Sequence, residues 1–212
     1  MLDHWLTHSK FKESYEKLVQ RLFRNKISPN HLTIIGLILG LTSAASIFLS
    51  DVFSLLFIVF YIISTILMAL SFLFDTFDGV IARMREPTKF GGILDIFCDR
   101  TVEVSIIIAF VSTDPISLLY PGLFSLGGMV LCISMFLLSS IELNKSPEEE
   151  KAKIISYRKG FMERSETLIF FLLTNIIYIC RSLLLWVFAI LVLLTAFIHL
   201  IQTFKDLNSE KR

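Results

Sequence analysis

Four aspartates lie within one short stretch of the chain, at spacings that a helix would place on one face. Asp75 and Asp78 are three residues apart, and Asp95 and Asp99 are four residues apart. Side chains at these spacings share a helix face, so two facing helices would present four carboxylates to one point. Like charges in one place cannot all stay ionised unless cations lie between them. Hard oxygen ligands of this kind suit Mg²⁺ or Mn²⁺, which usually also bind the phosphates of a substrate.

The composition around these aspartates is that of a membrane protein. The chain has 212 residues, of which 54% are hydrophobic and only 18% charged, and its mean hydropathy is +0.71. A carboxylate at membrane depth costs roughly 2.5–3.5 kcal/mol even on mild insertion scales, so the four aspartates need a compensating partner. The net charge is +1, so no global field favours nucleic acid as a partner.

Apolar runs predict an all-α, polytopic membrane protein with six transmembrane helices. A Ser28-Pro29-Asn30 sequence marks the start of the first helix. The turn between the fifth and sixth helices, at Arg181, is only weakly marked. The predicted spans are about 31–49, 53–82, 91–111, 118–142, 167–180 and 182–204. The predicted division is an N-terminal cytosolic or interfacial segment (1–30), a transmembrane catalytic domain (31–204) and a cytosolic tail (205–212).

The N-terminal segment reads as an amphipathic helix. Phe11, Tyr15, Leu18 and Leu22 recur at helical spacing among charged residues. Such a helix lies on the membrane surface or packs on the cytosolic face of the same protein, and the sequence leaves both options open.

Positive charge sets the expected orientation in the membrane. With six spans, the N-terminal segment, two loops (83–90 and 143–166) and the tail lie on one side and hold 18 of the 20 Lys and Arg residues. Cytosolic segments carry the excess of Lys and Arg. We therefore expect both termini in the cytosol and the four aspartates near the cytosolic face.

The acidic stretch has eight fixed positions of a recognisable signature: Asp75-x2-Asp78-Gly79-x2-Ala82-Arg83, then Gly91-x3-Asp95-x3-Asp99. It resembles the signature of the CDP-alcohol phosphatidyltransferases, membrane enzymes that build phospholipid headgroups. One departure is that seven residues separate the arginine from the glycine, where the family usually has eight. The six spans, the surface helix and Pro29-Asn30-x2-Thr33 also resemble this family.

The resemblance implies a reaction and its cofactors. The donor would be a CDP-lipid, typically CDP-diacylglycerol, and two divalent cations (Mg²⁺ or Mn²⁺) held by the four aspartates would clamp its diphosphate. A small alcohol acceptor would attack the lipid-side phosphorus with Asp99 as general base, and CMP would leave. The resemblance further implies a homodimer in the lipid bilayer.

The resemblance also implies which residues contact the two substrates. Gly79 lets the nucleotide approach the helix, and Arg83 can pair with phosphate. The implied CDP-lipid contacts are Pro29, Asn30, His31, Leu32, Thr33, Gly79, Ala82, Arg83 and Thr88. The basic loop offers Arg158, Lys159 and Arg164 for an anionic acceptor, such as glycerol 3-phosphate or inositol phosphate. Alternatively, these charges only reflect membrane topology.

Other interpretations of the aspartates stay open at this point. They could form a structural ion-pair network with Arg83 and Arg100, although the spacing of Arg100 and Glu103 predicts a local salt bridge. An intramembrane prenyltransferase also uses aspartates, Mg²⁺ and a diphosphate donor. A divalent-cation transporter would use aspartates as an ion path, but such proteins often show repeated, broken helices, and no repeat is visible here.

Overall fold

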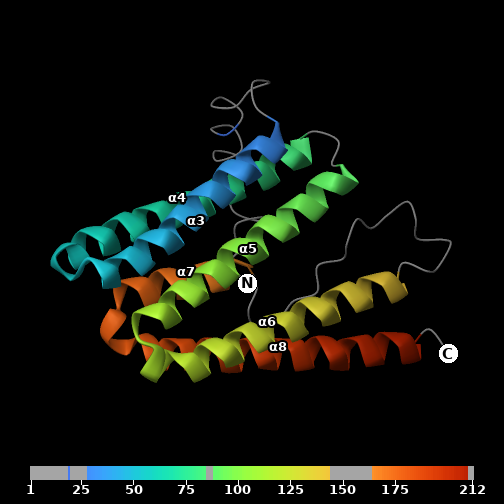
Figure 1. Ribbon diagram of the computed structural model, residues 1–212. Helices are drawn as coiled ribbons and strands as arrows, with labels where there is room; N and C mark the ends of the chain where they lie inside the picture. Colours follow the sequence, from blue (N-terminus) through green and yellow to red (C-terminus); the bar gives the residue numbers. More distant parts are fainter. Residues whose placement is uncertain (1–18, 20–27, 85–87, 144–163, 210–212) are drawn as a thin grey trace, which may run out of the picture.

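Helices make up the described chain. The computed structural model describes residues 19, 28–84, 88–143 and 164–209. From residue 28 onward the described residues form six α-helices and two short 3₁₀ turns, with no strand, as the all-α prediction requires. The helices labelled in Figure 1 are α3 (Pro29–Val52), α4 (Phe57–Met84), α5 (Lys89–Thr113), α6 (Pro115–Leu143), α7 (Arg164–Ile176) and α8 (Arg181–Ser209).

Helix α3 packs against both α4 and α5, and small residues permit this close approach. The Ser71 hydroxyl of α4 donates a hydrogen bond of 2.7 Å to the carbonyl of Gly36 in α3. On the α5 side, a Cβ added at Gly40 would lie 2.5 Å from both methyl carbons of Val102. Small residues allow helix backbones to approach closely within a membrane. Helix α3 therefore lies between the two helices that carry the halves of the acidic stretch and packs on both of them (Figure 1).

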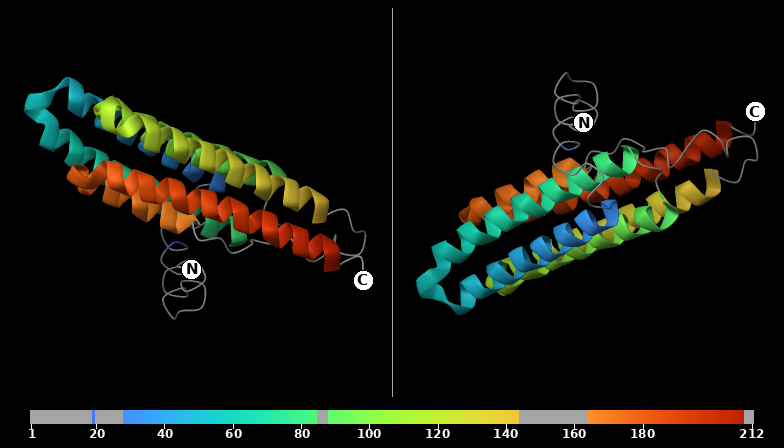
Figure 2. Two further views of the ribbon diagram at one scale, coloured as in Figure 1. Left: turned by 90° about the horizontal axis from the view of Figure 1, so that it is seen from below. Right: turned by 90° about the horizontal axis from the view of Figure 1, so that it is seen from above.

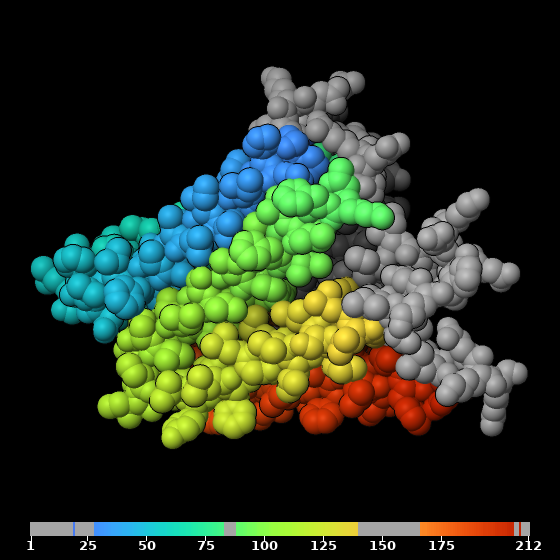
Figure 3. All heavy atoms as spheres, turned by 45° about the vertical axis from the view of Figure 1, so that its right-hand side comes forward, coloured from blue at the N-terminus to red at the C-terminus, as the bar shows by residue number. Residues whose placement is uncertain are grey.

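The main core joins these helices to α7 and α8 through aromatic contacts. The ring centroids of Phe171 in α7 and Phe188 in α8 are 5.2 Å apart, and Phe110 of α5 lies 6.4 Å from Phe171. All three side chains are buried. Helices α6 and α8 run side by side along the bundle (Figure 2), and the pair lies next to the layer of α3 and α5 (Figure 3).

Four helical segments are long and apolar enough to cross a membrane: Pro29–Val52, Ser54–Ala82, Pro115–Ser139 and Tyr178–Lys205. They match the predicted first, second, fourth and sixth spans and make the protein a multi-pass membrane protein. The predicted third span forms α5, which is long enough but carries several charged residues, and the predicted fifth span forms α7, which has only 13 residues. These two spans stay predictions.

The weakly marked boundary near Arg181 is a tight turn. The Tyr178–Cys180 segment is a 3₁₀ turn, and α8 begins at Arg181. The buried Arg181 guanidinium donates hydrogen bonds to Thr113 Oγ1 at 2.7 Å and to Tyr61 Oη at 2.5 Å. These contacts tie α4, α5 and α8 together at the end of the bundle opposite the aspartates.

The predicted amphipathic helix of the N-terminal segment lies outside the described residues, apart from Val19. This residue is fully buried in a hydrophobic cluster with Leu32, Phe77, Val80 and Ile81. Val19 therefore packs on the ends of α3 and α4 that lie nearest the acidic stretch.

Candidate active site

Three of the four aspartates converge where α4 ends and α5 begins. Carboxylate oxygens of Asp75, Asp95 and Asp99, one from each residue, all lie within 4.8 Å of one another. Two oxygens on opposite sides of a bound Mg²⁺ are about 4 Å apart. The three carboxylates thus have nearly the spacing that one divalent cation requires, and hard carboxylate oxygens are the ligands such a cation prefers.

Local structure at the start of α5 places two of these carboxylates. Asp95 and Asp99 are one helical turn apart and share a face of α5. Thr88 caps this helix, because its Oγ1 accepts a hydrogen bond of 3.0 Å from the backbone N–H of Gly91. A Cβ at Gly91 would lie 2.9 Å from Thr88 Oγ1 and 3.2 Å from Asn30 Oδ1. Glycine at this position therefore lets the starts of α3 and α5 meet beside the aspartates.

Asp78 has a different environment from the other three aspartates. Its side chain is buried, with 4% exposed, and its Oδ2 accepts a hydrogen bond of 2.6 Å from the Thr33 hydroxyl of α3. It does not belong to the group of three converging carboxylates. Asp78 therefore lies outside the close group of three, and it has a partner on α3 that helix spacing within α4 could not indicate. That all four aspartates hold cations stays a prediction.

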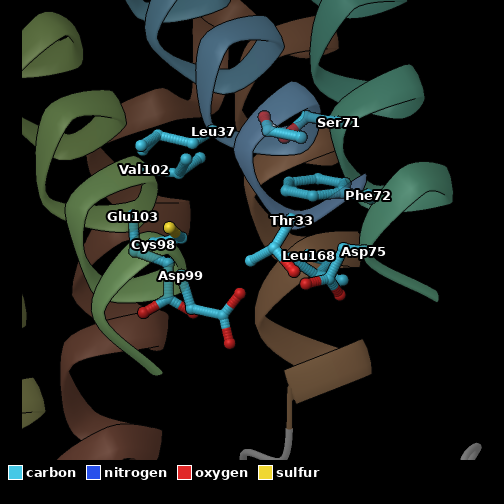
Figure 4. A pocket seen from close by; sticks show the side chains of 11 residues that line it. Thr33, Leu37, Ser71, Phe72, Asp75, Cys98, Asp99, Val102, Glu103 and Leu168 are labelled. Atoms are coloured by element: carbon cyan, nitrogen blue, oxygen red, sulfur yellow. Dashed lines mark hydrogen bonds between the residues drawn. The ribbon is translucent and has the colours of Figure 1, made fainter. Parts of the chain in front are cut away.

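A small cavity of about 20 Å³ lies beside the aspartates. A volume of this size holds about one water-sized ligand. In Figure 4, Asp75 approaches the cavity from α4, Asp99 from α5, and Thr33 lies between them on α3. The lining residues are Thr33, Gly36, Leu37, Ser71, Phe72, Asp75, Cys98, Asp99, Val102, Glu103 and Leu168. Three helices thus contribute polar groups to one small cavity.

Arg100 and Glu103 form the salt bridge that their spacing predicts. Arg100 Nη1 lies 2.6 Å from Glu103 Oε2, and Arg100 Nη2 donates a hydrogen bond of 2.8 Å to Oε1. Glu103 is 2% exposed and Arg100 is 31% exposed. Because both terminal nitrogens of the Arg100 guanidinium contact the Glu103 carboxylate, this glutamate is the main ionic partner of Arg100.

The other predicted contact residues have varied positions. His31 is exposed, while Pro29, Asn30, Gly79 and Ala82 are half-buried. The Leu32 side chain is fully buried in the cluster with Val19, so only its backbone could face a donor. The side chain of Arg83 is not described, nor is that of Arg164, the first residue of α7. Arg158 and Lys159 lie outside the described residues.

Sequence reasoning missed the bond between Thr33 and Asp78 and several cavity-lining residues. Ser71 precedes Asp75 by four residues, so helix spacing could have placed it on the same face. Cys98 lies next to Asp99 and is buried. The contact between α3 and Asp78 had no signal in local spacing, because 45 residues separate its partners.

The described helices and carboxylates define a class: a multi-pass helical membrane protein with an acidic site suited to a divalent cation. The sequence profile of the CDP-alcohol phosphatidyltransferases matches residues 26–201. The chain therefore belongs to the CDP-alcohol phosphatidyltransferase family, a class of phosphotransferase enzymes.

Curated relatives match this chain over different lengths. The archaetidylinositol phosphate synthase of Pyrococcus horikoshii is 32% identical over 99 residues, which are 46% of this chain and 48% of that protein. The match therefore spans about half of that relative's length. The inner membrane protein YnjF of Escherichia coli is 27% identical over 176 residues, covering 82% of this chain and 81% of the relative.

Solved structures share the fold. The phosphatidylinositol phosphate synthase PgsA1 of Mycobacterium tuberculosis with CDP-DAG bound has a TM-score of 0.68 and 20% identity, covering 89% of this chain and 92% of that one. The structure of PgsA1 in complex with manganese and citrate also has a TM-score of 0.68 and is 19% identical, covering 89% of this chain and 88% of that one. At this identity the likeness establishes a common helical architecture.

Proposed function

We propose that this enzyme transfers the phosphatidyl group of CDP-diacylglycerol to a hydroxyl of a phosphorylated polyol and releases CMP. The observation that carries the proposal is the convergence of Asp75, Asp95 and Asp99 in a chain of this family. The preferred polyol is inositol phosphate rather than glycerol 3-phosphate. The names of the Pyrococcus relative and of the mycobacterial structure, both synthases of inositol phosphate lipids, support this preference.

The proposed reaction is a displacement at phosphorus. The acceptor oxygen forms a bond to the lipid-side phosphorus, the bond from that phosphorus to the CMP phosphate oxygen breaks, and CMP leaves with the electron pair. The proton of the attacking hydroxyl passes to the carboxylate of Asp99, which acts as general base. Two Mg²⁺ or Mn²⁺ ions would neutralise the diphosphate and stabilise the departing oxygen. Asp75, Asp78, Asp95 and Asp99 would hold these ions.

The donor would lie along the ends of α3 and α4. Gly79 and Ala82 leave this part of α4 without bulky side chains, so a nucleotide can approach the helix. Arg83 would pair with the donor's phosphates. On the other side of the site, the segment from Pro29 to Leu32 and the α5 cap at Thr88 would border the nucleotide, since Asn30 lies against the start of α5.

The acceptor would be recognised by its negative charge. Arg158, Lys159 and Arg164 precede or begin α7, and Leu168, one turn into that helix from Arg164, lines the cavity beside the aspartates. A phosphorylated polyol bound by these cations would present its hydroxyl toward Asp99. Guanidinium and ammonium groups bind phosphate through charge-assisted hydrogen bonds.

The proposed topology has six spans with both termini and the active site on the cytosolic side. Helix α5 has 25 residues, about 37 Å at 1.5 Å per residue, which exceeds the roughly 30 Å hydrocarbon core. Its Asp99 and Glu103 line the cavity shared with α3 and α4, so these acidic side chains need not face lipid. The N-terminal amphipathic helix and a homodimer complete the proposal.

CMP release by the purified protein tests the function. CDP-diacylglycerol is supplied with Mn²⁺ or Mg²⁺, and inositol phosphate and glycerol 3-phosphate are added separately. We expect the protein to release CMP at least about 10-fold faster with inositol phosphate than with glycerol 3-phosphate, which corresponds to a difference of roughly 1.4 kcal/mol in the activation barrier. Asp99→Asn should abolish release, whereas the matched variant Asp114→Asn, at the opposite end of α5, should retain it. No release with either acceptor, or full activity of Asp99→Asn, would refute the proposal.

A further inference from the structure

A hydrogen bond between Thr33 and Asp78 joins α3 to the acidic stretch. The Thr33 hydroxyl lies 2.6 Å from Asp78 Oδ2 and 3.1 Å from the carbonyl oxygen of Pro29 in its own helix. Both side chains are buried, with 7% of Thr33 and 4% of Asp78 exposed. A hydroxyl has one proton to donate, and the shorter, charge-assisted contact to the carboxylate is the stronger of the two.

The helices around this bond hold the threonine in place. Ser71 donates a 2.7 Å hydrogen bond to the Gly36 carbonyl. Gly36 lies one turn from Thr33 on α3, and Ser71 lies two turns from Asp78 on α4. The same two helices are thus joined twice along one interface. Threonine is also β-branched, so its side chain has few rotamers within a helix. The rotamer present here places the hydroxyl within hydrogen-bond distance of both Asp78 Oδ2 and the Pro29 carbonyl oxygen.

The bond limits how Asp78 can take part in cation binding. Oδ2 accepts the Thr33 hydrogen bond, which leaves Oδ1 and the second lone pair of Oδ2 for a cation. Asp78 lies within electrostatic range of Asp95, one of the three converging carboxylates. Without a hydroxyl donor, a buried carboxylate loses a charge-assisted hydrogen bond and can turn away from its neighbours.

We propose that Thr33 is a positioning residue for Asp78: its hydroxyl holds the carboxylate in the orientation that completes the divalent-cation site, and it acts on the cation rather than on the CDP-lipid. This inference rests on the proposed function for the presence of the cation. It differs from the role that the family resemblance implies for Thr33, which is contact with the donor. The cavity supports it, since Thr33 lies between Asp75 and Asp99 (Figure 4). Its hydroxyl is bonded to Asp78.

Binding of Mn²⁺ alone, without lipid or acceptor, tests this role directly. The purified full chain is titrated with Mn²⁺ by calorimetry, and free Mn²⁺ is followed by electron paramagnetic resonance. We expect Thr33→Val to weaken Mn²⁺ binding by about 10- to 100-fold, the usual effect of removing a group that orients a metal ligand. Thr33→Ser keeps the hydroxyl and should stay within about threefold of the wild type. At saturating Mn²⁺, the KM for the donor should be nearly unchanged in all of these variants.

Thr42→Val is the matched control. It makes the same chemical change in the same helix. The hydrogen bonds of the Thr42 hydroxyl go to carbonyl oxygens of α3 itself, at 2.8 Å to Ile38 and 2.9 Å to Leu39. Its Mn²⁺ affinity should equal that of the wild type. A second test uses Asp78→Asn: because Thr33 acts through Asp78, adding Thr33→Val to that variant should not weaken Mn²⁺ binding further. This comparison also decides the matter if Thr33→Val alone lowers the melting temperature.

Two results would overturn the inference. One is wild-type Mn²⁺ affinity in Thr33→Val together with a raised donor KM, which would make Thr33 a donor contact. The other is an equal further loss of Mn²⁺ affinity when Thr33→Val is added to Asp78→Asn. Failure of the proposed function is a separate outcome, because it would show as absent CMP release in the wild type while the Mn²⁺ titrations still report on Thr33.

Discussion

Replacing Gly40 by alanine should push α3 and α5 apart. The added Cβ would lie 2.5 Å from both Val102 methyl carbons and 3.0 Å from Ser71 Oγ. Carbon atoms pack best at about 3.5–4.0 Å, so α5 must move by about 1 Å or Val102 must leave its rotamer. Valine has one strongly preferred rotamer in a helix, which makes the second route costly. Overpacking of this kind costs about 1–3 kcal/mol.

The displacement should also reach the active site. Val102 and Asp99 are three residues apart on α5 and both line the cavity, so a shift of one moves the other. A misplacement of about 1 Å at a reacting group can lower a rate roughly 100-fold. We therefore expect Gly40→Ala to reduce CMP release by about 10- to 100-fold and to lower the melting temperature by roughly 3–9 °C.

The assay is thermal unfolding in detergent together with CMP release at saturating Mn²⁺. The control is Gly127→Ala in α6, where an added Cβ meets nothing within 4 Å. That variant should be as stable as the wild type or slightly more so, since alanine favours helix over glycine. Adding Val102→Ala to Gly40→Ala should restore part of both readouts. Normal stability and activity in Gly40→Ala, or no recovery in the double variant, would refute the reasoning.

Three further predictions concern the cation and two arginines. Treatment with EDTA should abolish CMP release, and Mn²⁺ or Mg²⁺ should restore it in the wild type but not in Asp95→Asn, because the remaining carboxylates cannot complete the site. Arg100→Ala should lower the free energy of unfolding by about 2 kcal/mol, since it leaves the buried Glu103 carboxylate without its cation; the double variant Arg100→Gln/Glu103→Gln should recover part of this loss. Arg181→Ala removes hydrogen bonds to Thr113 and Tyr61 and should lower the free energy of unfolding by about 3 kcal/mol. The Mn²⁺ dependence of CMP release should stay at the wild-type value, because the site lies at the other end of the bundle.

Each of these predictions has a clear contrary result. CMP release that persists in EDTA would remove the cation from the proposed reaction. Equal stability of Arg100→Ala and the wild type, measured by thermal unfolding, would mean that solvent or another group compensates Glu103. A change in Mn²⁺ dependence caused by Arg181→Ala would mean that the two ends of the bundle are coupled.

Much of the architecture follows from local patterns in the sequence. Four apolar runs predicted the four described helical segments that are long and apolar enough to cross a membrane, because a membrane-spanning helix needs about 20 apolar residues in succession. The spacing of Arg100 and Glu103 predicted their salt bridge, since residues three apart on a helix are neighbours. The spacing of Asp95 and Asp99 likewise predicted that they share a face. Helix α7 was harder to delimit, because its turn with α8 at Arg181 carries no glycine or proline.

The packing between helices decided the rest. Helical spacing determines which side chains share a face, but not how far each helix is rotated or which helix it meets. The meeting of Asp75 with Asp95 and Asp99 required α4 and α5 to be brought together against α3. The partner of Asp78, Thr33, lies 45 residues away on a third helix. The sequence by itself thus determined the helices and the residues that could do chemistry. The rotation and close packing of three helices, which Gly40 permits, decided which carboxylates converge and which one is held by α3.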